Sequence, residues 1–312
     1  MTRILVAGEL NVDLVVTGLP SLPVIGRELT CTDFHVVLGS SSAITAARLA
    51  ALGAEVDFVG IVGKDEFGGV VLDELRRFGV GTGLIQQVDI KTGVTVALTY
   101  RADRALLTYP GTIAAYDGSN ITPELLADYD HLHVGAYFLQ TGLQAALPAL
   151  FERAREVGLT TSLDVGWDPI EQWDSNPTLM PTLAQTDFFF PNESEAAALT
   201  GPDLRIESLL AQVGGWLVVK QGAQGATAYG KMGESMSAPA LPVDVVDTTG
   251  AGDAFNAGFI YAHRVAGRTI ADALRFAAAC GAQAVTQVGG ATGAPTAESI
   301  QRLIEQQTKV QA

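Results

Sequence analysis

The sequence predicts an α/β fold in which a mostly parallel central sheet lies between helices. Short apolar runs alternate with amphipathic stretches along the chain, which is typical of βαβ units. The expected buried strands are residues 4–7, 56–62, 131–134, 160–165, 188–190 and 216–220, and the expected helices are 42–52, 67–78, 143–157, 193–199, 253–265 and 270–285. The 312 residues, 48% of them hydrophobic, are enough to bury one large core.

Two stretches do not follow this alternation. Residues 12–37 contain few helix signals, and the β-branched run 94–100 is followed, after a short polar turn, by a second run at 105–109. Such a pair of runs predicts a hairpin. Neither stretch is long enough to form a core of its own. We therefore expect one domain over residues 1–312, with a small β-sheet from residues 12–37 and 92–110 that acts as a lid.

Charge and composition limit the classes of partner. The net charge is −15, from 19 basic and 34 acidic residues, and Lys and Arg form no cluster, so no nucleic-acid partner is expected. Cys31 and Cys280 form no recognisable metal or disulfide motif. The sequence shows no secretory signal and no apolar run of membrane-spanning length. We therefore expect a cytoplasmic protein that does not bind a membrane.

The stretch DTTGAGDAFNAGF, residues 247–259, is the strongest chemical signal, and it follows a strand-like run at 243–246. Gly250 and Gly252 permit a tight turn that points the first N–H groups of a helix outward, which makes an anion site. Asp253 lies beside that site, where a carboxylate can accept a hydroxyl proton. The alternative is a Gly-rich turn in which Asp253 only caps the helix.

This stretch resembles the C-terminal signature of the ribokinase (PfkB) carbohydrate kinase family, and other segments follow that family's order across nearly the whole chain. The resemblance implies a ribokinase-like fold with a β lid. It also implies ATP-dependent phosphorylation of a hydroxyl, expected to be primary, on a sugar or sugar-like small molecule. By the resemblance, Asp253 is the catalytic base, and Gly250, Ala251 and Gly252 form the anion hole for the γ-phosphate. The alternatives are a nucleoside kinase of the same fold and a catalytically silent sugar- or nucleotide-binding sensor.

Two metal sites are implied by the resemblance. PNESE, residues 191–195, resembles the NxxE element of the family, in which Asn192 and Glu195 orient waters around Mg²⁺. The alternative for this pair is a capping box at the start of a helix. Asp247 and Thr249 match positions that help to bind a monovalent cation, K⁺, in some members.

The nucleotide site is implied by two further segments. LVVKQGAQGA, residues 217–226, resembles the strand and turn that lie over the nucleotide. The resemblance assigns Lys220, Gly222 and Gly225 to nucleotide binding, together with Asn192 and the anion-hole glycines. Lys220 either meets a phosphate or is a solvated lysine at a strand end. Residues 277–285 and 289–296 resemble the segments that flank the adenine and ribose.

The acceptor site is implied by the beginning of the chain. VAGELNVD, residues 6–13, resembles the first strand and substrate loop of the family. There Asp13 would bind sugar hydroxyls, because a carboxylate accepts two O–H bonds at once. The alternative is a turn that Asn-Val-Asp forms. Arg104, at the tip of the expected hairpin, either covers an anionic substrate or is a solvated turn residue.

The N-terminal signature departs from the family at GSSSAITA, residues 39–46. The family typically has two glycines and then an Asn that bonds the substrate. Here Gly39 is followed by Ser40, and Ile44 stands at the Asn position. Since the side chain of isoleucine forms no hydrogen bond, we expect poor activity on D-ribose and common hexoses relative to the true substrate.

Other polar residues have simpler interpretations. Asp164 and Asp168 follow an expected strand, where they either touch a ligand or form turns. His131 and His133 share one face of a strand, but a zinc site would need further ligands. The sequence contains no GxxxxGK[ST] motif and no GxGxxG after the first strand, which argues against a P-loop or dinucleotide-binding enzyme.

Association is predicted from the lid. Val94, Val96 and Leu98 alternate along the first hairpin strand and so share a face. Projecting strands also leave unpaired edges, which proteins usually cover. We therefore expect a homodimer that is joined through the lids.

Overall fold

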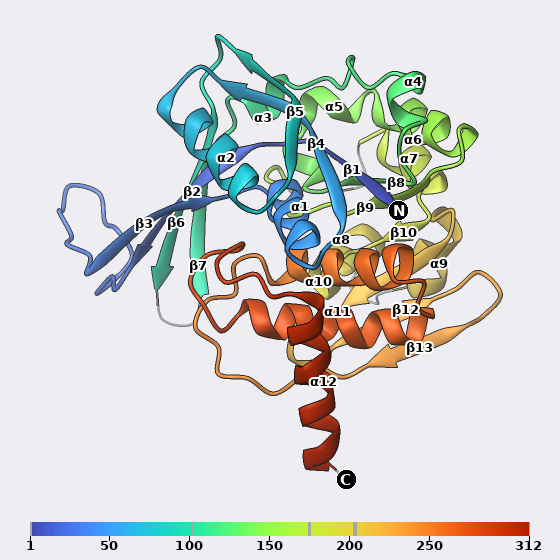
Figure 1. Ribbon diagram of the computed structural model, residues 1–312. Coiled ribbons are helices and arrows are strands. Elements are labelled where there is room, and N and C mark those ends of the chain that lie inside the picture. The colour runs from blue at the N-terminus through green and yellow to red at the C-terminus, as the bar shows by residue number, and fades with distance from the viewer. Residues whose placement is uncertain (1, 101–102, 174–175, 202–204, 312) are drawn as a thin grey trace.

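The computed structural model describes residues 2–100, 103–173, 176–201 and 205–311. Within these ranges, nine strands form the main sheet in the order β13-β12-β11-β10-β9-β8-β1-β4-β5 (Figure 1). The strands from β5 to β11 are parallel, and β12 is antiparallel to both of its neighbours. The strands are β1 (Arg3–Ala7), β4 (Glu55–Gly63), β5 (Gly81–Val88), β8 (His131–Val134), β9 (Thr160–Leu163), β10 (Phe188–Phe189), β11 (Trp216–Lys220), β12 (Ala226–Tyr229) and β13 (Ser235–Ala238).

Helices cover both faces of this sheet, so a hydrophobic core lies on each side. One face carries α1 (Ser41–Ala51), α2 (Glu66–Arg77), α10 (Ala251–Ile260) and α11 (Ile270–Ala284), with α12 (Ala297–Gln311) packed on α11. The other face carries α4 (Pro123–Leu126), α5 (Thr141–Gln144), α6 (Leu147–Glu156), α7 (Leu179–Ala184), α8 (Glu193–Thr200) and α9 (Ile206–Gln212). Since β1 is buried on both sides, Ile4 and Val6 join the first core and Leu5 joins the second.

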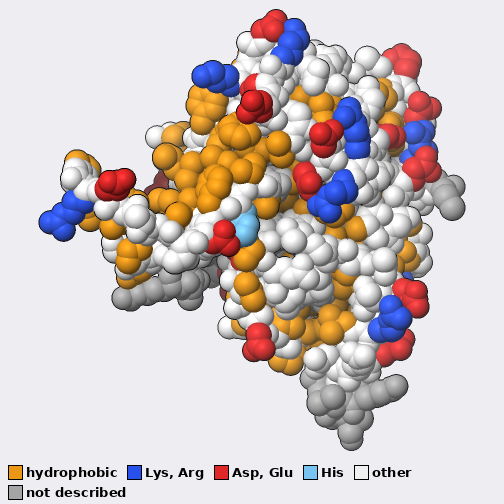
Figure 2. Space-filling view, turned by 60° about the vertical axis from the view of Figure 1, so that its left-hand side comes forward, with side chains coloured by type: hydrophobic (Ala, Val, Ile, Leu, Met, Phe, Trp, Pro, Cys, Tyr) orange, Lys and Arg blue, Asp and Glu red, His pale blue; other side chains and the backbone are white. Residues whose placement is uncertain are grey.

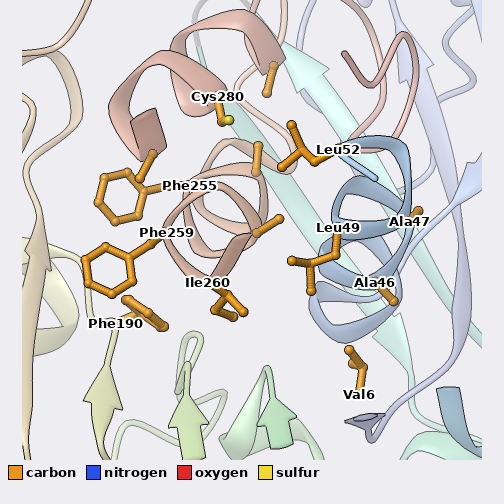
Figure 3. Close-up of a cluster of buried hydrophobic side chains, with 14 of the residues drawn as sticks. Val6, Ala46, Ala47, Leu49, Leu52, Phe190, Phe255, Phe259, Ile260 and Cys280 are labelled. Carbon is orange, nitrogen blue, oxygen red and sulfur yellow. The ribbon is translucent and has the colours of Figure 1, made fainter. Parts of the chain in front are cut away.

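The first core holds the two helices that matter most for the site. Figure 3 shows Leu49 of α1 and Ile260 of α10 facing one another above the strands, with Cys280 of α11 higher in the view. Phe255 and Phe259 extend from α10 on its other side. This packing fixes the starts of α1 and α10 relative to each other.

A small sheet projects from the main one in the order β3-β2-β6-β7 (Figure 1). Its strands are β2 (Asn11–Thr17), β3 (Asp33–Leu38), β6 (Gly93–Tyr100) and β7 (Asp103–Tyr109), and the short helix α3 (Thr112–Ala115) follows β7. The predicted hairpin is confirmed, since β6 and β7 are antiparallel. The residues 101 and 102 of its turn lie outside the described residues. We call this sheet the lid.

Two expectations of secondary structure were wrong. The strand-like run 243–246 joins no sheet: Val245 and Val246 are 63% and 59% exposed, and the N–H of Val246 donates to the carbonyl of Val285 at 2.7 Å. The expected helix 143–157 is divided into α5 and α6, because Pro148 has no N–H to donate and restarts the helix in its own first turn.

The other expected strands and helices are confirmed with small changes at their ends. α10 begins two residues earlier than expected and continues into a π-helical turn, Tyr261–Val265. Short 3₁₀ turns occur at Tyr137–Leu139 and Gly222–Gln224. None of the helices within the described ranges combines the length and the hydropathy that a membrane span requires.

Candidate active site

The carboxyl ends of the parallel strands bring polar side chains to one edge of the main sheet. Glu9 follows β1, Asp164 follows β9, and Lys220 ends β11. The lid strand β2 begins only four residues after β1 ends, so the lid stands over the same edge. The strand order also reverses beside β1, whose neighbours are β4 and β8. Such a reversal is where ligands bind in open α/β sheets.

Asp253 lies in the first turn of α10, on the floor of this region. The N-cap of α10 is Gly250, with a φ of 73°, so Asp253 does not cap the helix. Its carboxylate Oδ1 instead accepts a hydrogen bond from Ser41 Oγ at 2.6 Å. Burial, and next the nearby Asp164 carboxylate, raise the pKa of Asp253 to about 7. A carboxylate with such a pKa can accept a proton near neutral pH.

Lys220 is held at the start of α10 by a buried polar network. Its Nζ donates to Asp164 Oδ2 at 2.6 Å and lies 3.4 Å from Asn256 Oδ1. A β-carbon on Gly252 would lie 3.3 Å from this Nζ, so the ammonium group is next to the predicted anion hole. The interpretation of Lys220 as a solvated lysine is wrong, because only 13% of its side chain is exposed.

Lys220 and Asp164 each shift the pKa of the other in the direction that favours the charged form. Burial alone would lower the pKa of Lys220, but the Asp164 carboxylate beside it raises that pKa above its ordinary value. Burial would raise the pKa of Asp164, whereas the Lys220 ammonium and the hydrogen bond from Asn256 lower it. Both groups are therefore charged at neutral pH, and an ammonium group is available to a bound phosphate.

A cavity of about 570 Å³ opens beside the first turn of α10. Lys220, Gly222, Gly225 and Gly252 form part of its lining. Apolar residues line the remainder, among them Leu241, Pro242, Val243, Val245, Phe255, Ala278 and Val285. Gly222 has open space where a side chain would stand, whereas a β-carbon on Gly225 would lie 2.0 Å from the carbonyl oxygen of Ala238. The cavity therefore combines the Lys220 ammonium group and glycine backbone with a largely apolar lining.

Asn192 and Glu195 form the capping box of α8. Asn192 Oδ1 accepts from the N–H of Glu195 at 2.9 Å, and Glu195 Oε2 accepts from the N–H of Asn192 at 2.8 Å. Burial, and next the Asp164 carboxylate, raise the pKa of Glu195 to about 7. The pair thus stabilises the helix, and its oxygens are also hard donors of the kind that suits Mg²⁺.

Asp13 lies on the lid strand β2. Its Oδ1 accepts from Asn11 Nδ2 at 3.0 Å, and a β-carbon on Gly39 would lie only 2.2 Å from the same oxygen. Burial raises the pKa of Asp13 to about 6, and the positive charge of Arg104 opposes that rise. Arg104 reaches from β7 to the loop that precedes α10, where its Nη1 donates to Thr248 Oγ1 at 2.5 Å.

The hydrogen bonds of the side chains account for the run of three serines at residues 40–42. Ser40 replaces a family glycine but keeps a φ of 71°, and its Oγ caps α1 while it donates to the carbonyl oxygen of Glu9 at 2.6 Å. Ser42 donates to Glu9 Oε2 at 2.6 Å. Ile44 is buried with its Cδ1 2.4 Å from where a β-carbon on Gly290 would stand. Ile44 therefore packs against Gly290, and its effect on acceptor choice stays a prediction.

The remaining predicted groups have local partners. Asp247 accepts from the N–H of Thr249 at 2.9 Å and from its hydroxyl at 2.7 Å. Asp168 accepts from two backbone N–H groups of its own loop. His131 and His133 share hydrogen bonds with Ser162 Oγ at 2.8 and 2.7 Å. Within the described residues, no cluster of His, Cys, Asp or Glu has the makings of a protein-only metal site.

Sequence reasoning missed several residues of the site, namely Glu9, Asn11, Ser41, Arg48 and Asn256. Asn256 was detectable, because it follows Asp253 by three positions and so shares its helix face. Ser41 belongs to a run of three serines, and only the structure shows which of them bonds to Asp253. Glu9 and Asn11 lie within the VAGELNVD stretch, in which only Asp13 was given a role, and Arg48 lies in an otherwise apolar part of α1.

Comparison with known proteins agrees with this geometry. The model of the pfkB family of carbohydrate kinases matches residues 1–297. A ribokinase of Bacillus subtilis is 32% identical over 309 residues, which cover 97% of this chain and 100% of that protein. An ATP-dependent ribose-1-phosphate kinase of Halopiger xanaduensis is 31% identical over 307 residues, with 96% and 97% covered.

Solved structures share the fold. A ribokinase of Arabidopsis thaliana in complex with ribose and ATP has a TM-score of 0.84 at 24% identity, with 98% of this chain and 99% of that one covered. A putative ribokinase II of E. coli with ATP and Mg²⁺ has a TM-score of 0.86 at 24% identity, with 98% and 100% covered. The chain therefore belongs to the pfkB family of carbohydrate kinases, ATP-dependent phosphotransferases that act on an alcohol group.

Proposed function

We propose that this kinase transfers the γ-phosphoryl group of ATP to a primary hydroxyl of a sugar-like acceptor, with Asp253 as the general base. The observation that carries the proposal is the position of the Asp253 carboxylate. It lies in the first turn of α10, it is held by Ser41, and its pKa is about 7. The first N–H groups of α10 have no partner inside the helix, and that of Ala251 makes a long hydrogen bond of 3.3 Å to the carbonyl oxygen of Thr248.

The chemical step follows from this placement. Asp253 takes the proton of the acceptor hydroxyl as the oxygen forms its bond to the γ-phosphorus. The bond from that phosphorus to the bridging oxygen breaks, and its electron pair leaves on ADP. The backbone N–H groups of Gly250, Ala251 and Gly252, with the Lys220 ammonium, stabilise the negative charge on the transferring group. Positioning and charge neutralisation thus supply most of the catalysis.

ATP would bind in the cavity of about 570 Å³, with its base between the apolar residues and its phosphates toward Lys220 and Gly252. Mg²⁺, when bound with ATP, would neutralise phosphate charge. Asn192 and Glu195 would hold it through water, since their oxygens are hard donors near the Asp164–Lys220 network.

The acceptor would lie between Asp13 and Asp253, over the backbone of residues 39–41. Gly39 makes room at Asp13, and Ser41 bonds to Asp253. Asp13 can accept two hydroxyl hydrogens, which suits a polyol. A nucleoside acceptor is the second candidate, because one neighbour of the same fold is a nucleoside kinase of Methanocaldococcus jannaschii, with a TM-score of 0.80.

We also propose that two copies pair through their lids. The outer part of the lid face opposite Asp13 is apolar and open to solvent, and its most exposed members are Phe34, Val36, Leu107 and Tyr109, at 44% to 71%. Alternation along the strands puts Val94, Val96 and Leu98 on the same face. Figure 2 turns the lid side forward and shows hydrophobic side chains gathered on this part of the surface.

The deciding experiment is ADP release by Asp253→Asn, which keeps the shape of the side chain and removes the base. Turnover should fall by roughly 10²–10⁴-fold, while the variant still binds ATP in calorimetry. Turnover within a few-fold of the parent would rule out Asp253 as the base. If the parent releases no ADP with any acceptor but still binds ATP, the silent-sensor alternative holds.

The acceptor is found by measuring ADP release with a panel of sugars, sugar acids and nucleosides. The parent enzyme is expected to show a primary-alcohol sugar as its best substrate, with D-ribose and common hexoses poor. A nucleoside as the best substrate would favour the second candidate. Efficient turnover of ribose would show that Ile44, which packs against Gly290, does not restrict the pocket.

A further inference from the structure

Arg48 is a buried charged residue in α1 behind the catalytic centre. It is 2% exposed, and its Nε donates to the carbonyl oxygen of Gly290 at 2.7 Å. Its Nη1 donates to Gln283 Oε1 at 3.2 Å, and its Nη2 is buried without a hydrogen-bond partner within the described residues. A buried guanidinium group is costly unless its charge is used.

Gly290, whose carbonyl oxygen accepts from Arg48, connects this side chain to the Gly-rich loop at the start of α10. A β-carbon on Gly250 would lie 2.4 Å from the Cα of Gly290, so the two backbones are in direct contact. The N–H of the preceding Gly289 donates to Asp247 Oδ2 at 2.9 Å. The Gly289–Gly290 segment that Arg48 holds therefore contacts the start of α10 through Gly290 and the Asp247 carboxylate through the N–H of Gly289.

These contacts disagree with the monovalent-cation site that the family resemblance implied. Asp247 Oδ1 already accepts the N–H and the hydroxyl of Thr249, and Oδ2 accepts the N–H of Gly289. The nearby carbonyl oxygen of Gly290 accepts from Arg48. A K⁺ ion needs several oxygen atoms that are free to turn toward it, and these oxygens are engaged by protein donors.

We propose that Arg48 is a positioning residue that supplies a fixed internal cation behind Gly250 and Asp253, so that turnover does not depend on a bound monovalent cation. The proposal rests on the proposed function, since Asp253 is its base. The guanidinium holds the Gly289–Gly290 segment against Gly250. Its positive charge also favours the deprotonated form of Asp253 and so opposes the rise in the pKa of that carboxyl that burial causes.

Several groups act on Asp253 from the elements around it. The Asp164 carboxylate from the end of β9 raises the pKa of Asp253, while the Ser41 hydroxyl, the Lys220 ammonium and the Arg48 guanidinium lower it. The carboxyl of Glu195 on α8 is also within electrostatic reach. Loss of Arg48 therefore leaves Asp253 protonated to a higher pH, whereas loss of a merely structural residue would not.

The first test uses the parent enzyme with its best acceptor. Turnover in KCl is compared with turnover in tetramethylammonium chloride of equal ionic strength, and the melting temperature of the ligand-free protein is measured in both. We expect equal rates and equal melting temperatures. A saturable, several-fold activation by K⁺, or a melting temperature that K⁺ alone raises, would overturn the proposal. Neither outcome depends on whether Asp253 is the base, which Asp253→Asn decides separately.

The second test compares Arg48→Met with Arg48→Lys. Arg48→Met should lower kcat and move the acidic limb of its pH profile upward, with the KM for the acceptor little changed. Arg48→Lys, which keeps the charge, should leave the limb in place. An unmoved limb in Arg48→Met, with only a lower melting temperature, would show that Arg48 is structural.

The matched control is Arg268→Met, which removes a guanidinium that lies 4.8 Å over the ring of Phe276 and donates to Gln301. It should lower stability without moving the pH profile. If Arg48→Met does not fold, Arg48→Lys and the cation comparison still decide. In that case, Arg48→Lys with an upward-shifted limb would count against the proposal.

Discussion

Ser41 Oγ donates a hydrogen bond to Asp253 Oδ1 over 2.6 Å, and so joins the first turn of α1 to the first turn of α10. The two helices pack directly on each other in the first core, so the bond fixes the base relative to the main sheet. The same bond stabilises the charged form of Asp253 and partly offsets the effects of burial and of Asp164 on its pKa.

Ser41→Ala should therefore raise the pKa of Asp253 above its value of about 7. Because the base acts only when it is deprotonated, kcat/KM should fall most below pH 7 and recover at alkaline pH. The check is a pH–rate profile from pH 5.5 to 9.5. A uniform loss at every pH would mean that Ser41 positions Asp253 without changing its pKa.

Gly39→Ala should weaken acceptor binding. The new methyl group would meet Asp13 Oδ1 and Asn11 Nδ2 at 2.2 and 2.4 Å, so Asp13 must move. The KM for the acceptor should rise by about tenfold or more, with the KM for ATP unchanged. Gly69→Ala in α2, where a β-carbon meets nothing within 4 Å, is the control and should leave both constants unchanged.

Glu195→Gln should raise the Mg²⁺ concentration that gives half-maximal rate, because an amide binds hard cations less well than a carboxylate. The amide oxygen can still accept from the N–H of Asn192, so the melting temperature should change little. Glu193→Gln, in the same turn of α8, is the control. An unchanged Mg²⁺ titration with a lower melting temperature would leave the pair with a capping role only.

Lys220→Met should destabilise the fold by about 3–5 kcal/mol, because it leaves the buried Asp164 carboxylate without its cationic partner. Adding Asp164→Asn should restore much of the free energy of unfolding, measured in urea. Neither variant should recover turnover, because both lack the ammonium beside Gly252. A fully active double mutant would limit Lys220 to a structural role.

Leu107→Asp should disrupt association, since Leu107 is 71% exposed on the apolar lid face. We expect the parent protein to be a dimer at micromolar concentration in light scattering and the variant to be a monomer. Met232→Asp, which is 90% exposed on the β12–β13 connection, should leave the dimer intact. A monomeric parent protein would contradict the lid-to-lid pairing.

Buried elements were the part of the fold that the sequence predicted well. β1, β4 and β11 are mostly apolar runs with a charged residue at one end, and this pattern predicts buried strands. β5 was missed because it lies at the edge of the sheet, where polar residues such as Gln86 and Gln87 hide the strand pattern. The run at 243–246 was misassigned because its valines face solvent and the lining of a cavity.

The site was predictable where a motif fixes local geometry. Asp253, Gly250 and Gly252 belong to one turn, so their spacing in sequence is their spacing in space. The bonds from Ser41 to Asp253 and from Lys220 to Asp164 join residues 212 and 56 positions apart. No local pattern contains that information, because it depends on how the helices and strands pack.

The residues that connect β1 to the lid strand β2 are held firmly by the main domain. The N–H of Gly8 donates to the carbonyl of Val59, and Glu9 and Leu10 are buried before β2 begins. Amide exchange should therefore be slow at Asn11 and Asp13 and faster toward the outer strands of the lid. We therefore expect the lid to bend toward its outer end instead of moving as a rigid body. An arriving acceptor would find Asp13 already in place, while the end of the lid that carries Arg104 is held to the main domain only by its bond to Thr248 among the bonds described above.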